Sequence, residues 1–212
     1  MLVFIKMDYK YKFKIATVGD TGVGKTSLLN VKIDKNYLST HIPTIGVEYR
    51  TFIEKANSGE KVKFQIWDTS GEENFRSITK SYYRDTIASI IVFSFDNKES
   101  FKNVDYWVDE VRKHSNSIHH SIILVGNKCD LKYDGISSST VIEYADEKGL
   151  TYIETSCKNG INIDKFFKII AKIILDKIPY MHDINKEPGI ILNDYRKPIR
   201  AREYGYNCCT TH

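Results

Sequence analysis

The chain has 212 residues and a mass of 24.5 kDa, enough for one ordinary domain and a modest appendage. Its 42% hydrophobic content is sufficient for one packed core, while 12 glycines and 4 prolines are too few for a collagen-like or low-complexity chain. The formal net charge of +4 is small and spread along the sequence, so we expect no nucleic-acid partner.

The N-terminal stretch Met1–Lys14 mixes apolar residues with charges and contains no apolar core of a signal peptide. The longest apolar run, around Ile87–Phe95, is too short to span a bilayer and is typical of a buried strand. A chain without a secretion signal stays in the reducing cytosol, so we expect Cys129 and Cys157 to be free thiols.

Short strand-like runs alternate with amphipathic helical stretches, which predicts an α/β fold with a mostly parallel sheet. The predicted strands are Phe13–Val18, Val47–Lys55, Lys61–Trp67, Ser89–Phe95, Ile122–Gly126 and Thr151–Thr155. The predicted helices are Lys25–Asp34, Ser100–His114, Ser138–Lys148 and Ile163–Asp176. The turn residues Asn57-Ser58-Gly59 predict an antiparallel hairpin between the second and third strands.

The periodic pattern fails after about Pro179. Pro188-Gly189, Pro198 and scattered charges predict no regular element. We therefore expect one domain over residues 1–178 and a flexible tail over residues 179–212.

The first functional motif is a full match to the P-loop pattern, and it follows a predicted strand and opens a predicted helix. Its residues are Gly19-Asp20-Thr21-Gly22-Val23-Gly24-Lys25-Thr26. The glycines let backbone N–H groups turn toward a β-phosphate, and the helix N-terminus adds partial positive charge. Lys25 is expected to reach the β- and γ-phosphates and the Thr26 hydroxyl to ligate Mg²⁺. The alternative is a glycine-rich turn without function.

Three further residues fit a Mg²⁺ and γ-phosphate site. Asp68 ends a strand, as a carboxylate that holds a metal-bound water does. Gly71 lacks the Cβ that would keep its N–H from a γ-phosphate oxygen. Thr44, in a polar loop, is a candidate second hydroxyl ligand that orders only on the γ-phosphate, although alone it reads as an ordinary surface threonine.

Two later motifs predict recognition of guanine. In Asn127-Lys128-Cys129-Asp130, the Asp130 carboxylate can accept from the N1–H and the 2-amino group of guanine, a donor pair that adenine lacks. The Lys128 stem can cover the ring, and Asn127 can tie this loop to the P-loop. The second motif, at the end of the last strand, is Thr155-Ser156-Cys157-Lys158, and its Cys157 N–H can reach the guanine O6. All these motifs follow carboxyl ends of strands, where open α/β sheets bind ligands.

In order and spacing, Gly19 to Lys158 resembles the five nucleotide motifs of the Ras superfamily, and finer features resemble the Rab family over about residues 10–178. These features are Ile45–Tyr49, Glu73–Ile78, Ser81–Arg84 and Phe101–Val104 with Trp107. The resemblance implies a P-loop NTPase (Ras-like) fold with six strands and helices on both faces. It also implies a monomeric switch that binds GDP or GTP with Mg²⁺, hydrolyses GTP and serves vesicle traffic.

The resemblance also implies residue roles. Nucleotide contacts fall on Asp20, Thr21, Gly22, Val23, Gly24, Lys25, Thr26, Ser27, Tyr37, Thr44, Gly71, Asn127, Lys128, Asp130, Ser156, Cys157 and Lys158. Metal ligands fall on Thr26, Thr44 and Asp68, and catalysis on Lys25, Thr44 and Glu72. Tyr37 would pack edge-on to guanine, while the aromatic trio Tyr49, Trp67 and Tyr82 would present the active state to effectors. The family further implies an exchange factor, an activating protein and escort or dissociation-inhibitor proteins.

Glu72 is the main departure, because the family places a Gln there that orients the attacking water. An ionised Glu can accept a hydrogen bond from that water but has none to donate. We expect an unusual intrinsic hydrolysis rate, which leaves open a slowly hydrolysing, GTP-loaded Rab mimic that occupies effectors. A P-loop kinase or ATPase is a third reading, which Asp130 opposes. Lys32 and His41 are lesser departures, at positions where Rabs usually have an apolar residue and a Tyr.

The C-terminal Cys208 and Cys209 resemble the double-cysteine ending of Rabs, which carries two geranylgeranyl groups. Two lipid chains anchor a protein stably where one does so only marginally. We therefore expect attachment to the cytoplasmic face of intracellular membranes, with cycling through the cytosol; the alternative is two incidental exposed cysteines.

Overall fold

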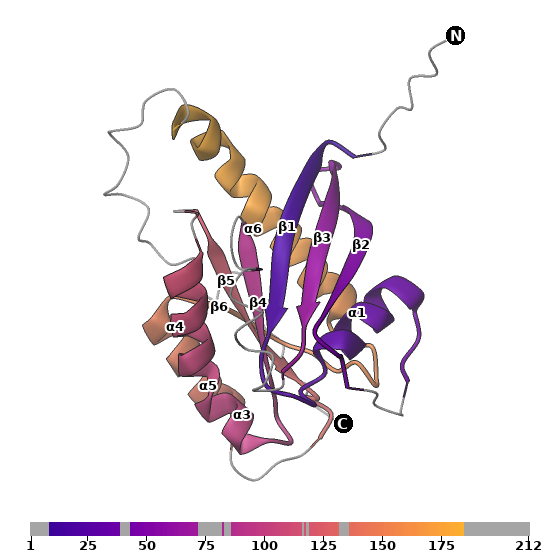
Figure 1. Ribbon diagram of the computed structural model, residues 1–212, viewed down its shortest axis with the longest axis vertical. Coiled ribbons are helices and arrows are strands. Elements are labelled where there is room, and N and C mark those ends of the chain that lie inside the picture. Colours follow the sequence, from indigo (N-terminus) through magenta and orange to yellow (C-terminus); the bar gives the residue numbers. More distant parts are fainter. Residues whose placement is uncertain are drawn as a thin grey trace.

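The protein is described by a computed structural model that covers residues 9–38, 43–71, 82, 86–115, 117, 119–131 and 136–184. In chain order its elements are β1 (Tyr11–Val18), α1 (Lys25–Asp34), β2 (Val47–Lys55), β3 (Lys61–Thr69), β4 (Ala88–Ser94), α3 (Lys98–Lys102), α4 (Val104–His114), β5 (Ser121–Asn127), α5 (Ser138–Lys148), β6 (Thr151–Glu154) and α6 (Ile163–Ile184) (Figure 1). Within these residues, no helix has both the length and the apolar character needed to cross a membrane.

A six-stranded sheet of order β2-β3-β1-β4-β5-β6 forms the centre of the molecule. Every neighbouring pair is parallel except β2 and β3, which form the predicted antiparallel hairpin. Its turn is closed by a hydrogen bond from the Gly59 N–H to the Ala56 carbonyl, with Gly59 at a φ of 88° that favours glycine. The expected sheet is thus confirmed.

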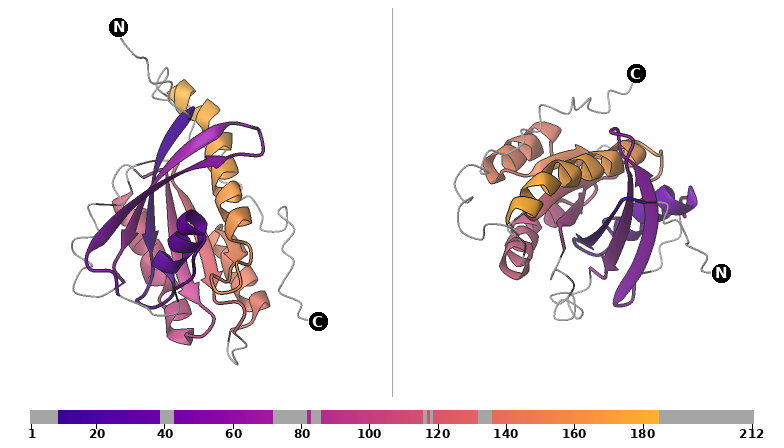
Figure 2. Two further views of the ribbon diagram at one scale, coloured as in Figure 1. Left: turned by 90° about the vertical axis from the view of Figure 1, so that its right-hand side faces the viewer. Right: turned by 90° about the horizontal axis from the view of Figure 1, so that it is seen from above.

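Helices cover both faces of this sheet, which accounts for the composition of its strands (Figure 2). α1 and α6 pack on one face, with Leu28 and Phe167 in that core, and α4 and α5 pack on the other, with Val108 and Val141 in theirs. Each residue of β4 is buried, as expected for a central parallel strand covered on both sides.

The helix bounds differ from the sequence prediction at two places. The predicted helix Ser100–His114 is two helices, α3 and α4, separated at Asn103. α3 begins earlier because the Asn97 side chain accepts from the N–H groups of Glu99 and Ser100.

The last helix was predicted to end at Asp176, and this end was wrong, because α6 continues to Ile184. It passes through the exposed Pro179, which removes only one backbone hydrogen bond from a helix whose apolar face is already packed on the sheet. The tail predicted from residue 179 therefore begins as helix, and residues 185–212 lie outside the described residues.

Candidate functional site: a phosphate cradle and a base loop

The loop between β1 and α1 forms a small pocket with two other segments at the carboxyl edge of the sheet. The pocket is lined by Thr21, Gly22, Gly24, Lys25, Thr26, Thr44, Ser70 and Gly71. Gly24 has a φ of 97°, and a Cβ there would collide with the Asn127 side-chain nitrogen. A Cβ on Gly71 would collide with the backbone of Asp20 and Thr21. Glycine at these positions lets three segments approach each other closely.

Lys25 is the only P-loop side chain with a buried charge. It is 6% exposed, and its ammonium donates to the carbonyls of Gly19 (2.8 Å) and Asp20 (2.7 Å). Burial lowers the pKa of Lys25 to about 8, while the Coulombic attraction of Asp68 and Asp20 opposes the fall. The charge is thus held in the pocket by carbonyls of its own loop, which are weaker partners than a phosphate oxygen.

The three predicted metal ligands lie together. The Thr26 hydroxyl donates to Asp68 Oδ2 at 2.5 Å, and the Thr44 hydroxyl lies 2.7 Å from the Thr26 hydroxyl. Asp68 is fully buried, and its Oδ1 has no hydrogen-bond partner among the described residues. Burial raises the pKa of Asp68 to about 6, despite the hydrogen bond from Thr26 and the nearby Lys25 charge.

Two hydroxyls and one carboxylate are the oxygen donors that Mg²⁺ prefers, and the ion normally keeps several waters beside such ligands. No group of three or more His, Cys, Asp or Glu side chains is arranged for a metal in the described part of the chain. The unpaired Asp68 oxygen and the paired hydroxyls therefore fit a hard cation that is bound together with phosphate.

The base loop after β5 is held by a neutral hydrogen-bond network around Asn127. Its side-chain nitrogen donates to the Val23 carbonyl at 2.9 Å, which ties the base loop to the P-loop as predicted. Its side-chain oxygen accepts from the Thr155 hydroxyl (3.2 Å) and the Cys157 thiol (3.4 Å). Burial raises the pKa of Cys157 to about 12, so this residue remains a thiol donor, and Cys129 and Cys157 are free as expected.

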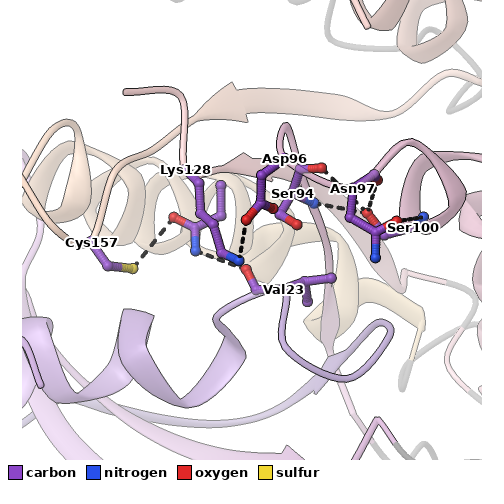
Figure 3. Close-up of polar contacts among 8 residues, drawn as sticks. Val23, Ser94, Asp96, Asn97, Ser100, Lys128 and Cys157 are labelled. Carbon is purple, nitrogen blue, oxygen red and sulfur yellow. Dashed lines mark hydrogen bonds and ion pairs between the residues drawn. The ribbon is translucent and has the colours of Figure 1, made fainter. Parts of the chain in front are cut away.

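Lys128 has a φ of 59° in the left-handed region, and its ammonium pairs with Asp96 at 2.8 Å (Figure 3). The pairing holds the lysine stem beside the loop. Asp130 is half-buried two residues later, Ser156 is buried after β6, and Lys158 is exposed. Asp96 was not predicted as part of this network from the sequence, because its partner Lys128 is 32 residues away along the chain.

The other residues predicted for the site differ in burial, and some lie outside the described residues. Val23 is buried, Ser27 lies in the first turn of α1, and Tyr37 is 42% exposed beyond that helix. The aromatic trio is brought together, since the ring centroids of Tyr49 and Trp67 and those of Trp67 and Tyr82 are each 5.0 Å apart. Glu72, His41, Cys208 and Cys209 lie outside the described residues.

Comparison with known proteins agrees with this geometry. The profile of the Ras family matches residues 14–176. "GTP-binding protein YPTM1" from Zea mays is 36% identical over 207 residues, 96% of this chain and 99% of the relative. "GTP-binding protein YPTM2" from Zea mays is 41% identical over 81% of this chain and 84% of its own length, and "Ras-related protein RABD2c" from Arabidopsis thaliana is 40% identical over 79% and 82%.

The chain therefore belongs to the Ras family, whose members are small GTPases. Within that family it is of the Rab type, a GTP-binding switch of vesicle traffic that hydrolyses GTP. As in the family generally, guanine nucleotide, Mg²⁺ and regulatory partners belong to this activity.

Proposed function

We propose that the pocket at the carboxyl edge of the sheet is the nucleotide site of this switch and that its residues have the roles predicted from the sequence. The unpaired buried oxygen of Asp68, beside two hydroxyls and the buried Lys25 charge, is the observation that carries this proposal. Phosphate oxygens would replace the loop carbonyls as acceptors of the Lys25 ammonium. Thr26, Thr44 and Asp68 would hold Mg²⁺, which neutralises charge on the β- and γ-phosphates when bound.

On the base side, Asp130 would accept from the guanine N1–H and 2-amino group, with Lys128 over the ring and the Cys157 N–H toward O6. Adenine would leave the Asp130 charge unpaired and partly desolvated, which costs a few kcal/mol. The Asn127 network fixes the base loop against the P-loop and the last strand, which supports a loop ordered for guanine recognition.

Titration of the purified protein with GDP and with ADP tests this site. We expect GDP to bind at least about 1,000-fold more tightly than ADP and Asp130→Ala to reduce that preference about 100-fold or more. Lys168→Ala, which removes an exposed charge from α6 outside the predicted site, serves as a control and should leave the preference intact. Equal binding of the two nucleotides by the natural protein would refute the proposed base recognition.

Hydrolysis would require Thr44 and Lys25 with the water held by Glu72. We infer that Glu72 makes the intrinsic rate unlike that of a Gln-bearing relative, since it accepts from the water but donates nothing to the γ-phosphate. Single-turnover hydrolysis by the natural protein and by Glu72→Gln tests this. Indistinguishable rates would remove Glu72 from the mechanism. A persistent GTP load after purification would instead favour a slowly hydrolysing protein that occupies effectors.

The effector surface would be formed by the trio Tyr49, Trp67 and Tyr82 with the neighbouring Ile45, which is 86% exposed.

Membrane attachment to the cytoplasmic face would depend on prenylation of Cys208 and Cys209. Replacement of both cysteines by Ser should move the protein to the soluble fraction of cells; a double variant that stays on membranes would exclude lipid anchoring at these residues.

A further inference from the structure

The side chain of Asp20, in the P-loop, accepts hydrogen bonds from Trp107 of helix α4 and from Asn103, the residue before that helix. Asp20 Oδ1 accepts from the Trp107 indole N–H at 2.8 Å, and Asp20 Oδ2 accepts from the Asn103 amide at 2.7 Å. Trp107 is 2% exposed, so its donor is fixed by the core. Both oxygens of an acidic group in a phosphate-binding loop are thereby occupied by neutral donors, 83 and 87 residues away in sequence.

The backbone of Asp20 faces the phosphate pocket. Its carbonyl accepts from the Lys25 ammonium at 2.7 Å, and its carbonyl carbon lies so close to Gly71 that any Cβ there would collide with it. Asp20 thus contacts α4, the P-loop lysine and Gly71. A rotation of this one residue would displace the two groups expected to meet the γ-phosphate.

Building on the nucleotide site proposed above, we propose that Asn103 and Trp107 are positioning residues that hold Asp20 and so slow the release of bound nucleotide. Hydrogen bonds to an ionised carboxylate are strong, and they orient the Asp20 peptide before a ligand binds. They also hold this negative charge against the N-terminal end of α4, where it repels the phosphates less than a freely moving carboxylate would. α4 is then a part of the molecule whose displacement would accelerate exchange.

Asn103 allows a clean test, because its side chain does not cap α4 and its contact with Asp20 can be changed without touching the core. The measurement is the release rate of a fluorescent GDP analogue from the full-length, Mg²⁺-loaded protein into excess GDP. We expect Asn103→Ala to speed release about fivefold and Asn103→Asp, which opposes two carboxylates, about 20-fold or more.

A paired exchange provides the specific readout. Adding Asp20→Asn to Asn103→Asp lets the new amide accept from Trp107 and donate to the new carboxylate, which restores both contacts with the roles reversed. The release rate of this double variant should return to within about threefold of the natural protein. A general loss of stability would not be repaired in this way.

Val111→Ala is the matched control, since Val111 is fully buried in the same helix and the same core cluster as Trp107. It should lower the melting temperature but leave the release rate unchanged. Release from Asn103→Asp at the natural rate, or equal acceleration by Val111→Ala, would overturn the inference. A natural protein that binds no GDP would instead refute the proposed site.

Discussion

Two lysines, the buried Lys25 and the half-buried Lys177, lie at opposite edges of the sheet, and each donates its hydrogen bonds to neutral oxygens. Lys25 follows β1 and donates to the carbonyls of Gly19 and Asp20, whereas Lys177 of α6 donates to the His119 carbonyl and the Ser121 hydroxyl, both at 2.7 Å. Burial lowers the pKa of each lysine to about 8. Judged by titration alone, either would be a functional candidate.

The two lysines differ in the groups that surround them. The buried Asp68 lies beside Lys25, and one of its oxygens has no hydrogen-bond partner among the described residues. The Lys25 ammonium itself donates to two carbonyls of the glycine loop. Beside Lys177, the acceptors belong to β5 and the turn before it, and His120 contacts the hydroxyls of Thr86 and Ser89. A buried carboxylate oxygen without a hydrogen-bond partner, beside a buried lysine in a glycine loop, indicates a ligand site, whereas a lowered lysine pKa among neutral side chains indicates only burial.

Replacement of each lysine by Met tests this difference and has the largest expected effect. Lys25→Met should weaken GDP binding about 1,000-fold, because two charge-assisted hydrogen bonds to phosphate are lost at a buried position. Lys177→Met should change GDP affinity less than about threefold, since its contacts lie at the other edge. Isothermal titration calorimetry of both variants measures the difference. Comparable losses of affinity in both would show that the two lysines are not functionally distinct.

A half-buried third lysine, Lys32, extends the comparison because its partners are carboxylates. Lys32, the departure noted in the sequence, lies 2.6 Å from both Glu54 and Asp164, and over the rings of Phe52 and Phe167. Burial works against its charge, but the hydrogen bonds that its ammonium donates to the two carboxylates prevail and raise the pKa of Lys32. The direction of a buried lysine's pKa shift therefore follows from its partners.

We expect Lys32→Met to lower the free energy of unfolding by about 2 kcal/mol, since it leaves the Glu54 carboxylate buried without a cation. Urea unfolding measures this loss. The double variant Lys32→Met/Glu54→Gln removes both charges and should recover at least half of it. A double variant as unstable as the single one would show that packing over the phenylalanine rings, and not charge pairing, gives Lys32 its effect.

These contacts also show which parts of the site could be predicted from the sequence. The P-loop, Asp68 and the Asn127 loop were predictable because each motif is local and follows a strand end, and parallel strands bring such ends together. The partners of Asp20 and Lys128 were not, since they depend on how α4 and the loop after β4 pack. Pro179 misled the prediction of α6, because the packed apolar face outweighs one missing hydrogen bond.

The smallest effect concerns the network around Lys177. Burial lowers the pKa of His120 to about 4, with the Lys177 charge adding to the fall. Because an unfolded histidine titrates near pH 6.5, the unfolded chain binds more protons than the folded chain between pH 6.5 and 4. The contribution of His120 to the free energy of unfolding is thus fully present above about pH 6.5 and is lost as the pH falls toward 4.

The expected loss from His120 is about 1.5 kcal/mol of unfolding free energy between pH 6.5 and 5, where most carboxylates remain ionised in both states. His120→Gln keeps a side chain that can pair with the Thr86 and Ser89 hydroxyls but cannot titrate. Urea unfolding of the nucleotide-free proteins across this range should show a shallower pH dependence in the variant by that amount. Equal slopes would mean that His120 takes up its proton at the same pH in the folded protein as in the unfolded chain, and the neutral network that distinguishes Lys177 from Lys25 would then be wrong.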